Sequence, residues 1–204
     1  MQNLSLKPHK INKRNNFIAG WYIDPTVCDD LVEYFKKSPN QLPGQTGGKD
    51  DQPEVDRTRK ASTDIVIPPS CIDEPVISYY RELNKVIGLY KKKYQACDIL
   101  FGSNQSYWGI VEPFNIQRYL PKEGYFAWHA ERSSKNTSHR LLTFLTYLND
   151  VKDGGGTQFH YQKIKTKAEK GLTVIFGADW NFFHRGITSK TETKYIATGW
   201  YSYI

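Results

Sequence analysis

Long apolar runs and paired cysteines are what this 204-residue sequence most clearly lacks. No hydrophobic stretch approaches the roughly 20 residues that a membrane-spanning helix needs. The basic segment 1–16 has no apolar stretch behind it and does not fit a secretory signal. The three cysteines form no Cys-x-x-Cys pair, and reduced thiols in the cytoplasm are their simplest account. We therefore expect a soluble, cytoplasmic protein with no membrane contact.

The formal net charge of +7 admits acidic partners, nucleic acid among them. Much of the excess positive charge lies in two short segments, 7–14 and 91–93. Aromatic residues are spread over the whole chain rather than interleaved with these cations. Such clusters are typical of solvated helix faces and a basic tail, so nucleic acid is only a secondary expectation as a partner.

Helices are predicted before most of the strands. Segment 16–23 predicts a first strand. Asp24-Pro25 predicts the start of a helix, because the apolar residues from Val27 to Phe35 follow helical spacing. Segment 38–54 is rich in proline, glycine and charge and predicts a long loop. Segment 62–68 alternates like a strand, and 74–95 predicts the longest helix.

After residue 107 the sequence changes to strand patterns separated by turn signals. Candidate strands are 114–119, 124–130, 140–148, 156–160, 171–176, 181–185 and 195–203. Helices followed by this many strands favour a mainly β (α+β) fold, a double-stranded β-helix or jelly-roll core with helices packed outside. We expect one domain over 1–204, in which 1–105 supports a catalytic core formed by 106–204.

His129, Glu131 and His184 are the strongest candidates for metal ligands. His129 and Glu131 are two positions apart, so a strand would project both side chains to one face. Two histidines and a carboxylate on one face of a metal leave positions open, the pattern of non-haem Fe(II) oxygenases. A chance His-x-Glu and a catalytic zinc site are the alternatives, although the chain has no His-Glu-x-x-His motif.

Lys194 begins a predicted strand, and Trp200 lies on the same face of that strand. A lysine pointing into a barrel is costly unless paired, and a bound dicarboxylate would supply the partner. Alternatively, Lys194 lies at the open end of the strand and extends into water. Tyr119, Thr143 and Tyr147 present further polar groups towards the same opening, unless they are simply satisfied core residues.

Several of these stretches together resemble the prolyl 4-hydroxylase group of Fe(II)/2-oxoglutarate dioxygenases. They are NIQRYLPKEGYFAWHAE, RLLTFLTYLNDVKDGGGTQF, KGLTVIF, HRGI and KYIATGWY, and the resemblance covers roughly 114–203. The resemblance implies that Lys194 binds the distal carboxylate of 2-oxoglutarate. It also implies iron ligands at His129, Glu131 and His184, cosubstrate contacts at Tyr119, Tyr147 and Thr143, and a substrate contact at Trp200.

The activity that the resemblance implies is hydroxylation of a substrate C–H bond, with peptidyl proline as the expected target. Fe(II), 2-oxoglutarate and O2 would be required, with ascorbate as a further cofactor, and succinate and CO2 would be released. The partner would be a peptide or protein. Loop 38–54 and segment 132–140 are expected to become ordered over the site when substrate binds.

One departure from the family pattern concerns Glu131, because the family usually has aspartate there. Glutamate offers the same oxygen donor on a side chain one methylene longer, and a halogenase is disfavoured because a carboxylate is retained. A nucleic-acid demethylase is a competing hypothesis, although no arginine follows Arg185 to serve as a second anchor. The sequence is also compatible with an oxygenase of a small metabolite and with a catalytically silent jelly-roll binding module.

Overall fold

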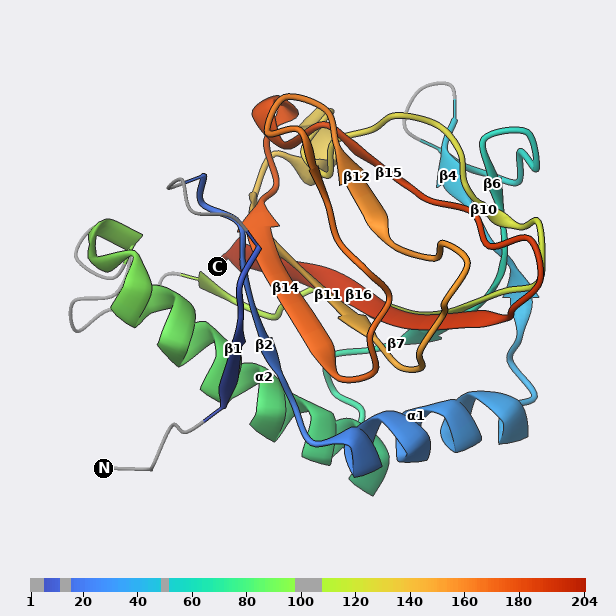
Figure 1. Ribbon diagram of the computed structural model, residues 1–204, viewed down its shortest axis with the longest axis horizontal. Helices are drawn as coiled ribbons and strands as arrows, with labels where there is room; N and C mark the ends of the chain where they lie inside the picture. The colour runs from blue at the N-terminus through green and yellow to red at the C-terminus, as the bar shows by residue number, and fades with distance from the viewer. Residues whose placement is uncertain (1–5, 12–15, 49–51, 98–107) are drawn as a thin grey trace.

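The computed structural model describes residues 6–11, 16–48, 52–97 and 108–204. Within these ranges an antiparallel nine-stranded sheet forms the centre of the molecule (Figure 1). Its order is β1 (Lys7–His9), β2 (Ala19–Tyr22), β14 (Leu172–Gly177), β11 (Arg140–Tyr147), β16 (Lys194–Tyr203), β9 (Phe114–Tyr119), β7 (Thr63–Ile67) and β3 (Leu42–Pro43), with β8 (Trp108–Gly109) paired to the end of β16.

A second, smaller sheet lies over one face of the first (Figure 1). It has the order β13 (Ile164–Lys165), β12 (Thr157–Phe159) and β15 (His184–Gly186). Two short pairs lie beside it, β10 (Gly124–Tyr125) with β6 (Lys60–Ala61) and β4 (Thr46–Gly47) with β5 (Pro53–Glu54). The two facing layers form the jelly-roll core that the sequence predicts.

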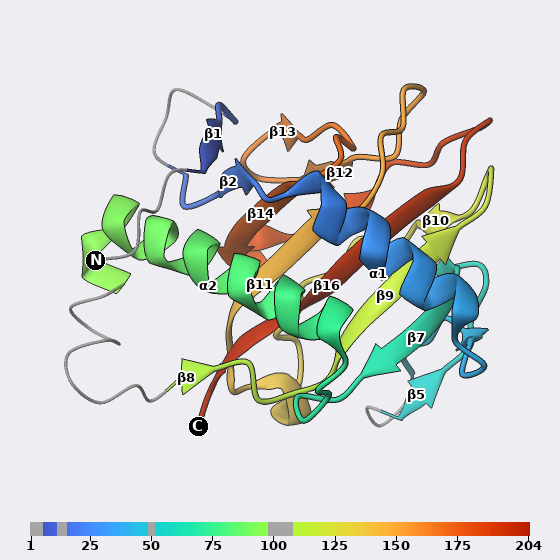
Figure 2. The same ribbon diagram turned by 90° about the horizontal axis from the view of Figure 1, so that it is seen from below.

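The two long helices cover the opposite face of the large sheet. Figure 2 shows α1 (Pro25–Lys37) and α2 (Glu74–Lys93) running across its strands. The Asp24 carboxylate caps α1 by accepting a 2.9 Å hydrogen bond from the Thr26 backbone N–H, as predicted. The apolar stripe of each helix is buried against the sheet. Among the described residues, neither helix is long and apolar enough to cross a membrane.

Most predicted strands match the structure within two residues, but three do not. The predicted strand 16–23 starts only at Ala19, the first residue of β2. The predicted strand 124–130 is wrong beyond Tyr125, because the backbone N–H groups of Phe126 and Ala127 both donate to the Arg59 carbonyl instead of continuing a ladder. The predicted strand 181–185 begins as a 3-10 turn (Trp180–Phe182), and β15 starts only at His184. In the predicted loop 38–54 the structure has β3, β4 and β5, while 49–51 lie outside the described residues.

Gly199 lies where β16 closely approaches the core beneath it. A Cβ at this position would lie 2.6 Å from Phe114 Cβ and 2.6 Å from Phe144 Cζ. Both phenylalanines are fully buried, so neither can move away without opening the core. We expect Gly199→Ala to lower the free energy of unfolding by about 1–3 kcal/mol, measured by denaturant titration.

Gly109→Ala is the matched strand control, because the nearest atom to its added Cβ is Ile204 Cδ1 at 3.8 Å. This variant should remain within about 0.5 kcal/mol of the parent chain. Equal stability of the two variants would contradict the packing described for Gly199.

Candidate metal centre and anion pocket

His129, Glu131 and His184 converge between the two sheets. One ligand atom from each residue lies within 4.8 Å of the others. The Nε2 atoms of His129 and His184 lie 3.6 Å and 3.3 Å from Glu131 Oε1. An isolated antiparallel bridge brings the histidines together, with 2.9 Å hydrogen bonds in both directions between their backbones. The chain therefore assembles the three donors from two segments more than fifty residues apart.

The orientation of both imidazoles fits a metal site. The Nδ1 of His129 lies 3.0 Å from the Ala127 carbonyl oxygen, and that of His184 lies 2.9 Å from the Phe182 carbonyl oxygen. A carbonyl only accepts hydrogen bonds, so each Nδ1 carries a proton and Nε2 is the ring nitrogen left to bind a metal. Fixing the tautomer through the second ring nitrogen is how metal-bound histidines are usually held.

The charge state of the cluster also suits a divalent cation. Burial raises the pKa of the Glu131 carboxyl, but its contacts with the two histidines outweigh this and hold the pKa well below its usual value. Burial and the neighbouring His184 both lower the pKa of His129. The cluster thus combines a carboxylate that stays ionised with the ring nitrogens of two histidines, the donor set that binds iron, zinc or similar metals.

These three residues open into a cavity of about 680 Å³. Six of the eight residues predicted for the site line this cavity: His129, Glu131, His184, Tyr119, Lys194 and Trp200. The Tyr147 hydroxyl instead forms hydrogen bonds of 2.8 Å and 2.6 Å with the hydroxyls of Thr157 and Thr166, and of these three only Thr157 is part of the lining. Thr143 is fully buried outside the lining, and its hydroxyl has no hydrogen-bond partner among the described residues.

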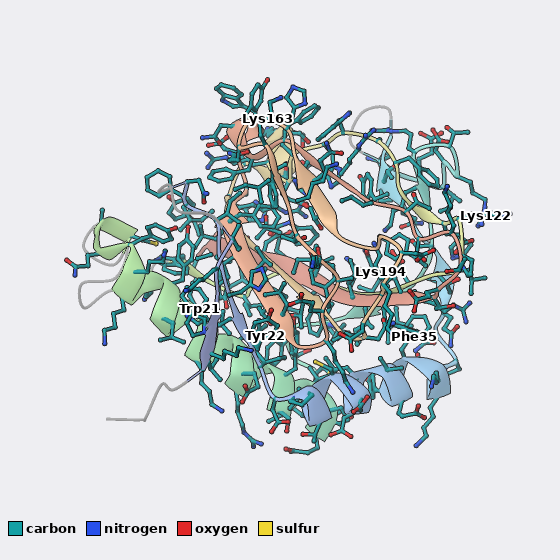
Figure 3. The ribbon with its side chains drawn as sticks, viewed as in Figure 1. Trp21, Tyr22, Phe35, Lys122, Lys163 and Lys194 are labelled. Carbon is teal, nitrogen blue, oxygen red and sulfur yellow. The ribbon has the colours of Figure 1, made fainter. Side chains whose placement is uncertain are left out.

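Lys194 is a buried cation without an ion-pair partner among the described residues. Figure 3 shows it on the side of β16 that faces β12 and β15. Burial lowers the pKa of its amine to about 8, and no carboxylate contributes to that shift. Its Nζ lies 4.5 Å from the ring centroid of Tyr119, its neighbour across the sheet. The pocket therefore favours an anion at this end.

Sequence reasoning missed a second buried lysine on the cavity wall. Lys60 Nζ forms a 2.6 Å ion pair with Asp64, and both side chains are almost fully buried. The same Nζ lies 5.8 Å from the ring centroid of Tyr125, which stacks on the His129 imidazole at 3.8 Å. The alternation Lys60-Ala-Ser-Thr-Asp64 in a strand could have signalled a polar pair on one face.

Comparison with known proteins identifies the same segment. Residues 114–202 match the family model described as the 2OG-Fe(II) oxygenase superfamily. A curated relative, prolyl 4-hydroxylase 13 of Arabidopsis thaliana, is 27% identical in a match covering 44% of this chain. That match spans 42% of the relative, so the chain corresponds to less than half of its length.

Solved structures share the fold over nearly the whole chain. A viral collagen prolyl hydroxylase of Paramecium bursaria Chlorella virus-1, with 2-oxoglutarate, has a TM-score of 0.65 at 18% identity, covering 93% of this chain and 97% of its own. A Pseudomonas putida prolyl-4-hydroxylase has a TM-score of 0.67 at 14% identity, with coverage of 93% and 94%. A Trichoplax adhaerens prolyl hydroxylase bound to a hypoxia inducible factor peptide has a TM-score of 0.67 at 16% identity, with coverage of 95% and 86%.

Proposed function

We propose that this chain is an oxygenase of the 2OG-Fe(II) superfamily, whose family model its residues 114–202 match, and that it hydroxylates a C–H bond of peptidyl proline. Fe(II) would be the cofactor, 2-oxoglutarate and O2 would be consumed, and succinate and CO2 would be released. One observation carries the proposal: a His, Glu and His cluster and a buried lysine without an ion-pair partner among the described residues share one cavity. The prolyl hydroxylase names of the relatives support proline as the target.

Each residue of the cavity would have a distinct task. His129, Glu131 and His184 would hold Fe(II), and the metal supplies, when bound, the activation of O2 that cleavage of a C–H bond requires. The Lys194 ammonium would bind the distal carboxylate of 2-oxoglutarate in a buried site, where the charge pair is strong. Trp200, on the same face of β16, would border the substrate.

The charges around the cavity favour a peptide over a nucleic acid. Of the four cations that line the cavity, Lys60 is paired with Asp64 and Arg140 with Glu112, so neither is free for a phosphate. Arg59 donates to the Gly47 carbonyl oxygen, which leaves Lys194 as the buried cation of the lining without such a contact among the described residues. Nucleic-acid binding draws most of its affinity from cations that neutralise phosphates. Lys194 is a single point charge, which suits a carboxylate rather than a polyanionic backbone.

The experiment is product analysis on a proline-rich peptide incubated in air with Fe(II) and 2-oxoglutarate. We expect a gain of one oxygen atom on proline, detected by fragmentation mass spectrometry. A peptide with alanine at each proline position should remain unmodified. Oxidation that is equal in both peptides would contradict proline as the target, while succinate formation without peptide oxidation would indicate another substrate class.

Binding of 2-oxoglutarate should depend on pH through Lys194. Burial lowers the pKa of the free amine to about 8, and the anion binds its protonated form. Affinity should therefore be constant below about pH 8 and fall by up to about tenfold per pH unit above it, until the pKa of the bound form is reached. The measurement is the Kd for 2-oxoglutarate, with Mn(II) in place of Fe(II), across this range.

Lys194→Arg is the control for this pH dependence, because a guanidinium stays charged throughout the range. The variant should lose the decline above pH 8, whatever its absolute affinity. A flat profile for the parent chain, or the same decline in both proteins, would contradict the assignment to Lys194.

A further inference from the structure

The two oxygens of Glu131 have different surroundings. Oε1 faces the histidine Nε2 atoms at 3.3 Å and 3.6 Å. Oε2 accepts a 2.9 Å hydrogen bond from the indole Nε1–H of Trp200. The carboxylate is therefore already oriented, with one oxygen turned towards the other donors and one turned away.

Arg140 holds the indole in place. Its guanidinium carbon lies 3.4 Å from the centroid of the Trp200 ring, a close cation–π stack. Its Nη1 also donates a 3.1 Å hydrogen bond to the backbone carbonyl oxygen of Glu131. One guanidinium thus contacts both the backbone of the carboxylate residue and the ring that binds its side chain.

Glu112 holds Arg140 in turn. Its two carboxylate oxygens accept hydrogen bonds from Arg140 Nε at 3.1 Å and 3.0 Å, and Oε2 accepts a third from Nη2 at 2.8 Å. Ser202 Oγ donates a further 2.5 Å hydrogen bond to Glu112, and His139 Nε2 lies 3.2 Å from it. This planar fork geometry fixes the guanidinium better than a single point charge could.

We propose that Trp200, Arg140 and Glu112 form a carboxylate clamp that makes Glu131 a one-oxygen metal ligand. A glutamate has one more rotatable bond than an aspartate, so its carboxylate must be restrained to present the same atom to a metal. With Oε2 occupied by the indole, the carboxylate takes a single coordination position and leaves the others for cosubstrate and O2. The inference rests on the proposed function, because it assigns positioning residues to that metal site.

Cobalt binding tests the clamp without requiring turnover. Co(II) accepts nitrogen and oxygen donors, and its visible spectrum reports the coordination geometry. Trp200→Phe removes the indole N–H but keeps a ring on which Arg140 can stack. We expect this variant to bind Co(II) about 10- to 100-fold more weakly than the parent chain, with an altered visible spectrum. Trp180→Phe, at an indole that is 68% exposed, is the matched control and should change neither.

A double variant separates positioning from general damage. We expect the carboxylate of Glu131→Asp, which is one methylene shorter, to reach the metal or the indole but not both, so that the benefit of the N–H is already lost in this variant. Adding Trp200→Phe to Glu131→Asp should then change Co(II) affinity by less than about threefold, a strongly non-additive result. Equal losses in both backgrounds would overturn the clamp, and so would unchanged affinity and spectrum in Trp200→Phe alone.

Misfolding of Trp200→Phe and failure of the parent chain to bind Co(II) have different consequences. If Trp200→Phe does not fold, Arg140→Lys takes its place, because lysine keeps the charge opposite Glu112 but lacks the flat surface that stacks on the indole. Co(II) affinity of Arg140→Lys equal to that of the parent chain would overturn the clamp. Failure of the parent chain itself to bind Co(II) would overturn the metal site, and with it the proposed function.

Discussion

Replacing His184 with alanine is expected to abolish 2-oxoglutarate turnover and to weaken metal binding severely. His184 is one of only three donors that converge on the site within the described residues, and its side chain is buried. Loss of an outer partner of a metal ligand costs about 10- to 100-fold in affinity, so loss of a ligand itself should exceed that range. Titration with Mn(II), together with succinate formation, measures both effects.

His160→Ala provides the matched control for this substitution. His160 lies just after β12, but its side chain is exposed and packs against Trp128. Metal affinity and succinate formation should therefore stay close to those of the parent chain. Retention of metal affinity within a few-fold in His184→Ala would contradict the facial triad.

Replacing Lys194 with methionine is expected to weaken 2-oxoglutarate binding while raising the free energy of unfolding of the anion-free protein. Methionine keeps most of the length of the side chain and removes the charge, so 2-oxoglutarate loses its buried partner. Truncating one member of a buried charge pair costs about 2–5 kcal/mol, which corresponds to roughly 30- to several-thousand-fold in affinity. Calorimetric titration of the Mn(II)-loaded protein with 2-oxoglutarate measures this loss.

The same variant should be more stable than the parent chain when no anion is bound. Burial lowers the Lys194 pKa from 10.5 to about 8. The charged amine therefore lowers the free energy of unfolding at neutral pH by about 3 kcal/mol. Lys194→Met removes this cost, and its unfolding free energy at pH 7 should rise. Because the pKa is depressed, the gain should shrink as pH increases through and above 8.

Lys190→Met, at an exposed lysine on the loop before β16, is the control for both measurements. It should leave 2-oxoglutarate affinity and stability unchanged. Lower stability of Lys194→Met than of the parent chain would mean that the amine has a partner in the free protein. Unchanged 2-oxoglutarate affinity would remove Lys194 from the anion pocket.

The face of β16 shows how much local periodicity can predict. Alternation placed Lys194 and Trp200 on one face of a strand, and both line the cavity. The same rule put Tyr147 on the inward face of its strand, yet its hydroxyl is bonded to Thr157 and Thr166. Period-two alternation gives the side of a sheet but not the hydrogen-bond partner at the tip of a side chain.

The carboxylate clamp could not be read from sequence for a related reason. Arg140 and Glu112 are 28 positions apart, and Trp200 follows on a third segment, so only the tertiary fold brings them together. The short pairs β4–β5 and β6–β10 are similar, because two-residue strands carry no period and exist only through their partners. Long strands and capped helices, by contrast, carry their own local signals.

Succinate formation from 2-oxoglutarate, in air with added Fe(II), is the most direct test of the metal centre and the anion pocket. The parent chain should form succinate, stimulated by a proline-rich peptide, and both His129→Ala and Lys194→Ala should lose this activity while remaining folded. A folded parent chain that forms no succinate and binds neither Fe(II) nor 2-oxoglutarate would contradict the account. The same cavity would then belong to a binding module rather than an oxygenase.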